Sequence, residues 1–137
     1  MTVVFDTNTL ISAAIFPASI PGKCLFGFII PIKIIYSSSC MQELEEVIYR
    51  NKFDKYLTNE EKYRFLASFK KMSNLLDTSS IITDCRDPKN NKFLELAIDG
   101  NADYIITSDP DLLILHPYLG ISIVTPAQFL SIFINEK

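Results

Sequence analysis

Four carboxylic acids in this sequence follow predicted strands of the chain, each in a different segment. Asp6 comes directly after an apolar run, and Asp109 lies two residues beyond the end of another. Asp87 opens a predicted helix after a strand, and Glu43 lies near the start of a further helix. The carboxyl ends of strands in an open parallel sheet meet at one edge, where ligands bind. We therefore expect these four acids to converge on one site.

Carboxylates that are held close together repel one another, and a hard divalent cation with oxygen ligands relieves the repulsion. Mg²⁺ or Mn²⁺ is the ion that such a ligand set favours. These ions polarise a phosphoryl oxygen, activate water and stabilise the leaving oxygen of an in-line displacement. The residues therefore predict phosphodiester hydrolysis. Asp111 is a further candidate ligand, with capping of the turn at 112–115 as its alternative role.

Each acid also has a simpler explanation, because aspartate after a strand or before a helix commonly forms a turn or a cap. The argument depends on the coincidence of four. Helical geometry does not choose between Glu43 and Glu45, which flank the same apolar face about 100° away on either side. Glu46 is expected to point to solvent. Asn8 either hydrogen-bonds Asp6 or a metal-bound water, or caps the first helix.

Several other kinds of site are excluded by composition. His116 is the single histidine, which excludes sites that need two imidazoles. The three cysteines, Cys24, Cys40 and Cys85, form neither a Cys-x-x-Cys pair nor a disulfide-type pattern, so we expect buried free thiols. The four glycines fall in no phosphate-binding pattern, which argues against a nucleotide cofactor.

The length and charge of the chain set further limits. With 137 residues, 48% of them hydrophobic, we expect one domain spanning residues 1–137. The longest apolar stretch, residues 25–36, is interrupted and too short for a membrane span, and no secretory signal is recognised, so the prediction is a cytoplasmic protein. Thirteen basic residues against 16 acidic ones give a net charge of −3. Contact with nucleic acid must therefore be local or assisted by metal.

Short β-branched runs alternate with longer helical stretches, a pattern typical of a parallel sheet covered by helices on both faces. The predicted fold is a three-layer α/β sandwich with a mostly parallel, twisted sheet of about four to five strands. The predicted strands are residues 2–5, 34–36, 80–83, 104–107 and 121–124. The predicted helices are residues 8–15, 21–30, 40–49, 59–75, 87–99 and 125–134.

Four segments together resemble the PIN-domain family, particularly the VapC-like toxin components of bacterial toxin–antitoxin pairs. The matching segments are residues 3–8 (Val-Val-Phe-Asp-Thr-Asn), 43–47, 86–97 and 102–113, the last of which contains Ser108. They span nearly the whole chain. The resemblance implies a PIN-like fold, a ribonuclease dependent on Mg²⁺ or Mn²⁺, an RNA substrate and a cognate antitoxin as partner. It also favours Glu43 over Glu45.

One departure from the family pattern concerns the residues after Asp87. Similar sequences usually have aspartate at the position of Asn90, whereas this chain has Lys89-Asn90-Asn91. If that position supplies the third acid of the family, metal binding is weakened or activity is lost. If Asp87 is the third acid, little changes. Asn90, Asn91 and Ser108 are included as supporting residues in either case.

Two competing functions also fit parts of the sequence. The run from Asp6 resembles the nucleophile loop of haloacid-dehalogenase-type phosphatases, but Asn8 stands where that chemistry needs a second aspartate as general acid. The other is a degenerate PIN fold that binds RNA or protein without catalysis. Lys89 and Lys92 are the predicted RNA contacts, with solvated surface lysines as the alternative. The apolar second and last helices suggest a homodimer or antitoxin surface, with core burial as the alternative.

Overall fold

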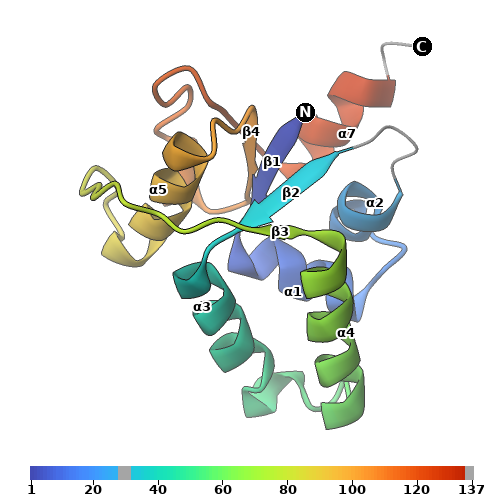
Figure 1. Ribbon diagram of the computed structural model, residues 1–137. Coiled ribbons are helices and arrows are strands. Elements are labelled where there is room, and N and C mark those ends of the chain that lie inside the picture. Colours follow the sequence, from blue (N-terminus) through green and yellow to red (C-terminus); the bar gives the residue numbers. More distant parts are fainter. Residues whose placement is uncertain (28–31, 135–137) are drawn as a thin grey trace.

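A parallel sheet lies at the centre of the structure, a computed structural model that describes residues 1–27 and 32–134. Five strands of this part of the chain pair in the order β3-β2-β1-β4-β5, all in parallel (Figure 1). They are β1 (Thr2–Phe5), β2 (Lys33–Tyr36), β3 (Asn74–Leu75), β4 (Tyr104–Ile106) and β5 (Ser122–Val124). In the register of the two central strands, Phe5 lies opposite Ile106. The chain therefore leaves β1 and β4 at the same level.

Seven α-helices of the described ranges surround these strands, with short 3-10 turns between some of them. They are α1 (Thr7–Ile15), α2 (Ile20–Phe26), α3 (Ser38–Ile48), α4 (Asn59–Met72), α5 (Asn91–Asp99), α6 (Pro110–Leu113) and α7 (Pro126–Ile134). The turns are η1 (Asn51–Phe53) and η2 (Pro88–Asn90). Side chains of Asp6, Ser37 and Thr58 cap α1, α3 and α4 by accepting backbone N–H groups, as these residue types favour.

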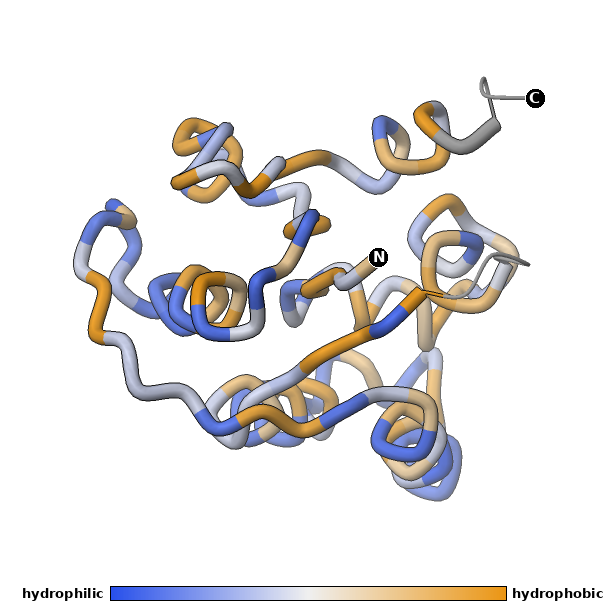
Figure 2. Tube along the Cα trace, turned by 45° about the horizontal axis from the view of Figure 1, so that its top comes forward, coloured by the Kyte–Doolittle hydropathy of each residue, from blue (hydrophilic) through white to orange (hydrophobic). Residues whose placement is uncertain are grey.

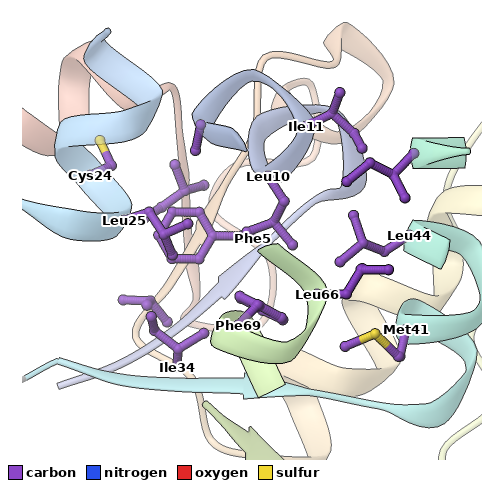
Figure 3. Close-up of a cluster of buried hydrophobic side chains, with 14 of the residues drawn as sticks. Phe5, Leu10, Ile11, Cys24, Leu25, Ile34, Met41, Leu44, Leu66 and Phe69 are labelled. Carbon is purple, nitrogen blue, oxygen red and sulfur yellow. The ribbon is translucent and has the colours of Figure 1, made fainter. Parts of the chain in front are cut away.

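Residues that alternate along β1 face opposite sides of the sheet and enter two different cores. Val3 and Phe5 belong to a cluster with α1, α3 and α4, and Val4 belongs to a cluster with α5. Figure 3 shows Phe5 in the first cluster, close to Leu10 and Leu25. Most helices are banded blue and orange along their turns in Figure 2, which reflects one polar and one apolar face. The predicted α/β sandwich is confirmed.

The predicted third strand, residues 80–83, is wrong. These residues form no strand, because side chains of α5 take their backbone donors: Ser80 N–H donates to Asp99 and Ile82 N–H to Glu95. The third strand is instead Asn74–Leu75, which pairs with β2. The helix predicted to reach residue 75 accordingly ends at Met72. The predicted second helix ends earlier too, at Phe26, and its predicted residues 28–30 lie outside the described residues.

Of the helices in the described ranges, none has by itself the length and apolar character that crossing a membrane requires. The pair α1 and α2 meets the length and composition criteria together, but the two helices are bent by 97° relative to each other. Leu10 of α1 and Leu25 of α2 are both buried in the core of the chain.

Packing of α3 against the sheet can be tested at Leu44, the neighbour of Glu43. Leu44 is 1% exposed, so we expect Leu44→Ala to lower the free energy of unfolding by about 2–5 kcal/mol through lost burial and a residual cavity. The exposed neighbour Gln42 is the control, and Gln42→Ala should change stability by less than about 0.5 kcal/mol. Urea denaturation measures both. Equal effects of the two substitutions would contradict the packing described here.

Candidate functional site

Asp6 lies at the junction of β1 and α1, where it is both the last residue before the helix and the helix cap. Its Oδ1 accepts the N–H of Thr9 at 2.9 Å, and its Oδ2 accepts the hydroxyl of Thr107 at 2.5 Å. The side chain is only 5% exposed. Two hydrogen bonds therefore hold a nearly buried carboxylate in one orientation at the edge of the sheet.

Thr107 connects Asp6 to Asp109. While its hydroxyl donates to Asp6, the same oxygen accepts the N–H of Asp109 at 2.9 Å. Asp109 in turn caps α6, because its Oδ1 accepts the N–H of Asp111 at 2.9 Å. The level register of β1 and β4 makes this bridge possible across 101 residues of sequence. The two aspartates are thus placed as one unit by a single threonine.

Asn90, the last residue of η2, lies next to Asp109. Its amide Nδ2 donates to Asp109 Oδ2 at 2.8 Å, and Asn90 is 8% exposed. Asp87 lies farther out as the cap of η2, with Oδ1 accepting the N–H of Lys89 at 3.1 Å. Both residues line the same cleft, but the residue in hydrogen-bond contact with Asp109 is the amide.

Glu43 approaches from α3, and both of its carboxylate oxygens are engaged. Thr7 donates its hydroxyl to Oε1, and the Lys92 ammonium lies 2.5 Å from Oε2. Lys92 also donates to the carbonyl of Lys89 at 2.5 Å. Glu45 instead pairs with Lys70 at 3.1 Å, away from the acids. The geometry therefore favours Glu43 over Glu45 as the α3 contribution to the site.

These residues surround a cleft of about 440 Å³. One face of α3 forms a wall, since the lining residues Ser39, Glu43 and Val47 recur at helical spacing. The lining residues are Asp6, Thr7, Asn8, Ser39, Gln42, Glu43, Glu46, Val47, Arg50, Lys52, Asp87, Lys89, Asn90, Lys92, Phe93 and Asp109. Glu46, predicted to point to solvent, does so with a side chain 73% exposed, at the rim of the cleft.

A second hollow, of about 350 Å³, adjoins the cleft. The two share Asp6, Asn8 and Asp109, and the second also contains Ser108. Asn8 is exposed at this junction and does not cap α1, because Asp6 does. The aspartates therefore face two connected openings.

Two predicted site residues are turned elsewhere. The carboxylate of Asp111 pairs with Arg86 at 2.8 Å. Asn91 is buried and accepts the N–H of Cys85 at 2.9 Å through its side-chain oxygen. Neither is among the residues that line the cleft. Asp111 acts in the turn after Asp109, and Asn91 fixes the segment that leads into η2.

Burial dominates the electrostatics of Asp6. Desolvation raises the pKa of Asp6 above its ordinary value, the hydrogen bonds from Thr107 and Thr9 oppose the rise, and the charge of nearby Asp109 adds to it. An ionised Asp6 therefore carries negative charge that its surroundings do not fully balance.

The donor set fits a divalent ion that retains most of its water. Within the described parts of the chain, no three His, Cys, Asp or Glu side chains lie close enough to hold a metal by themselves. Mg²⁺ commonly needs only one or two protein carboxylates, with water and substrate phosphate completing its octahedron. Asp6 and Asp109, with Glu43 and the Asn90 amide oxygen nearby, would supply such ligands, and the uncompensated charge at Asp6 favours a cation.

Four site residues escaped the sequence-based prediction. Thr7 and Thr107 orient Glu43 and Asp6 through their hydroxyl groups. Both lie within two residues of a predicted acid, and this proximity was the available signal. Arg50 and Lys52 also line the cleft although they follow α3, and the sequence carried no signal for either position.

Comparison with known proteins identifies the family. Residues 2–111 match the family model described as PIN domain, so the chain belongs to the PIN-domain family. PIN domains are generally nucleases. The chain is 37% identical over 142 aligned positions to the uncharacterized protein MJ1680 of Methanocaldococcus jannaschii, an alignment that covers 96% of this chain and 90% of that protein.

A solved structure has a similar fold. It is the crystal structure of VapBC2 from Rickettsia felis bound to a DNA fragment from their promoter. The TM-score is 0.63 at 16% identity, and the match covers 91% of this chain and 98% of the other. At this identity the likeness concerns the fold.

The charge of Asp6 should be visible in stability. Because its pKa is raised by folding, protonated Asp6 stabilises the folded state, and this stabilisation is lost as the pH rises through the folded pKa. Asp6→Asn keeps the cap and removes the charge. In EDTA at pH 7 we expect the variant to have a higher Tm than the unsubstituted protein, with the difference shrinking as the pH is lowered and Asp6 becomes protonated. Exposed Asp77 is the control, and Asp77→Asn should show no such pH-dependent difference. A lower Tm for Asp6→Asn at pH 7 would contradict the account.

Proposed function

We propose that this chain is a divalent-metal-dependent endoribonuclease that hydrolyses phosphodiester bonds and acts as the toxin of a toxin–antitoxin pair. One observation carries the proposal: Asp6 and Asp109 are linked by Thr107 at the base of a cleft, where burial leaves the Asp6 charge poorly compensated. Membership of the PIN-domain family supports nuclease chemistry at that position. We take residues 1–137 as one nuclease domain.

The residues of the cleft divide the proposed work between them. Asp6 and Asp109 would hold Mg²⁺ or Mn²⁺, with Glu43 and the oxygen of Asn90 or Asp87 completing the acidic side. When bound, the ion supplies Lewis-acid activation of the scissile phosphate and of the attacking water. Thr107 and Thr9 keep the Asp6 carboxylate oriented, so little reorganisation is needed when substrate arrives. Asn8 and Ser108 present polar groups beside the two aspartates.

Lys89 and Lys92 are the proposed phosphate contacts on the wall formed by η2 and α5. Lys89 is exposed and lines the cleft. Lys92 is held by Glu43 and is 20% exposed, so it would also balance the charge of Glu43 before substrate binds. An RNA phosphate entering the cleft would thus meet lysine charge on one side and the acids below it.

The proposed partner is an antitoxin protein, and the proposed location is the cytoplasm. The fold similarity to a chain from a VapBC2 structure supports such a partner. Three buried free thiols agree with a reducing compartment.

Leu25 of α2 and Phe129 of α7 are buried within the chain, while Ile20 and Phe26 of α2 are exposed. A homodimer would use these exposed side chains, and the molar mass in solution tests it.

The second candidate function is a degenerate PIN fold that binds RNA or protein without cleaving it. Asn90 favours this candidate, because a neutral amide stands beside Asp109 where a third carboxylate would strengthen metal binding. The two candidates differ in one measurable property, the cleavage of RNA in the presence of metal.

Incubation of the protein with single-stranded RNA and Mn²⁺ tests the proposed function. We expect cleavage that stops in EDTA and falls in Asp6→Asn by more than the roughly tenfold to hundredfold typical of residues that merely support a metal ligand. Asp77→Asn, with the same chemical change at an exposed site, should cleave normally. No cleavage by the unsubstituted protein would favour the degenerate fold, and cleavage that persists in EDTA would exclude the metal mechanism.

Asn90→Asp tests whether a third carboxylate beside Asp109 strengthens metal binding. The substitution adds a carboxylate and removes the amide donor to Asp109, so Mn²⁺ should bind about tenfold more tightly and cleavage should increase. Isothermal titration calorimetry measures the affinity. Asn101→Asp, at an exposed position, is the matched control and should leave it unchanged. Unaltered Mn²⁺ affinity in Asn90→Asp would mean that Asp87 already serves as the third acid.

A further inference from the structure

The segment that connects α3 to α4 alternates aromatic and basic residues. We call residues 49–56 the connecting segment, and its sequence is Tyr-Arg-Asn-Lys-Phe-Asp-Lys-Tyr. Three of its residues are basic and one is acidic, in a chain whose net charge is −3. It therefore concentrates positive charge locally, which the overall composition conceals.

The connecting segment continues the wall of the cleft. Arg50 and Lys52 line the same cleft as Asp6 and Glu43. Glu43 lies on α3, and Arg50 follows two residues after Ile48, the last residue of that helix. Arg50 forms a 3.7 Å pair with Glu46, but both side chains are more than half exposed, so water screens the pair and phosphate can displace it. The lining of the cleft thus includes basic side chains of the connecting segment as well as the acids.

Packing holds the connecting segment in place. Its single acid, Asp54, accepts a hydrogen bond at 2.6 Å from Lys62, whose side chain is fully buried. Phe53 packs against the core cluster that includes α1 and α3. The ring of Tyr56 meets that of Phe16 at 5.8 Å in an edge-to-face arrangement. The charge of Asp54 is therefore paired by the buried Lys62, and the packed rings fix the backbone that carries the basic side chains.

Two aromatic rings of the connecting segment remain accessible. Tyr49 is 41% exposed and Tyr56 is 46% exposed. Lysine ammonium groups lie 5.1 Å above ring centroids at two places, Lys52 over Phe53 and Lys55 over Tyr56. Basic groups that follow a phosphate backbone, combined with rings on which bases stack, are the means by which proteins bind single-stranded nucleic acid. Paired bases offer no free face for such stacking.

We propose that the connecting segment binds single-stranded RNA beside the point of cleavage, with Arg50 and Lys52 on backbone phosphates and Tyr56 stacked on an unpaired base. The identity of the ligand as RNA rests on the proposed function. The surface itself is argued from its charge, its exposed rings and its continuity with the cleft. A protein occupant, which would not require these phosphate contacts, is an outcome of the test.

Fluorescence anisotropy of a fluorescein-labelled oligouridine strand, titrated with protein in EDTA over a range of salt concentrations, tests the proposal without cleavage. We expect the double variant Arg50→Gln/Lys52→Gln to bind about tenfold more weakly at low salt. The slope of log affinity against log salt should fall by about 1.4, since each single-strand phosphate contact contributes about 0.7. The control Lys23→Gln/Lys71→Gln removes the same charge from exposed residues that do not line the cleft.

Tyr56→Leu separates stacking from charge. Leucine retains apolar packing against Phe16 but offers no ring to a base, so affinity should fall about tenfold with an unchanged salt slope. Circular dichroism and thermal unfolding verify that the variants fold.

The proposal is overturned if both double variants weaken binding equally, if neither does, or if oligouridine does not bind the unsubstituted protein. If Arg50→Gln/Lys52→Gln cleaves RNA normally and binds it with unchanged affinity, the connecting segment is not an RNA-binding surface, and the proposed nuclease function still stands. Weakened binding by that variant, in a protein that does not cleave RNA, would support the connecting segment as an RNA-binding surface and contradict the proposed nuclease function.

Discussion

A carboxylate buried at the carboxyl end of the central strand is the constraint around which the site is built. Asp6 must cap α1, accept the Thr107 hydroxyl and remain nearly inaccessible to water, all with a side chain of two oxygens. Each hydrogen bond lowers the cost of ionisation, and burial raises it by more. The position of α1 and the register of β1 against β4 supply these two hydrogen bonds, so the fold directly sets how easily Asp6 ionises.

Much of the arrangement could be predicted because it follows from local rules. Strand ends, helix caps and apolar periodicity located β1, β4 and the helices that follow them, and the crevice rule indicated where their acids would lie. The strand predicted at 80–83 failed because Asp99 and Glu95 take its backbone donors, and these partners lie 13 or more residues away in sequence. Side chains that compete for a backbone donor across such a distance leave no periodic signal.

The candidates for the position beside Asp109, which are Asp87 and Asn90, show a second reason why prediction from sequence fails. The sequence predicted Asp87 as one of the converging acids, and the family resemblance left open whether the position of Asn90 supplies the third acid instead. A short 3-10 turn separates the two, and its geometry directs Asn90 towards Asp109 while Asp87 caps the turn from outside. Hydroxyl groups were also overlooked, because Thr7 and Thr107 carry no charge and their role depends entirely on which carboxylate each one reaches. Prediction of such roles requires the tertiary structure.

The parallel register of β1 and β4 has a consequence for the timing of synthesis. The hydrogen bond from Thr107 to Asp6 spans 101 residues, and the pair between Lys92 and Glu43 spans 49. A nascent chain that has not yet emerged as far as Asp109 contains Asp6 but lacks the second aspartate of the site. Contacts of such long sequence separation form slowly and late in folding. The cleft is therefore completed only after synthesis has passed Asp109.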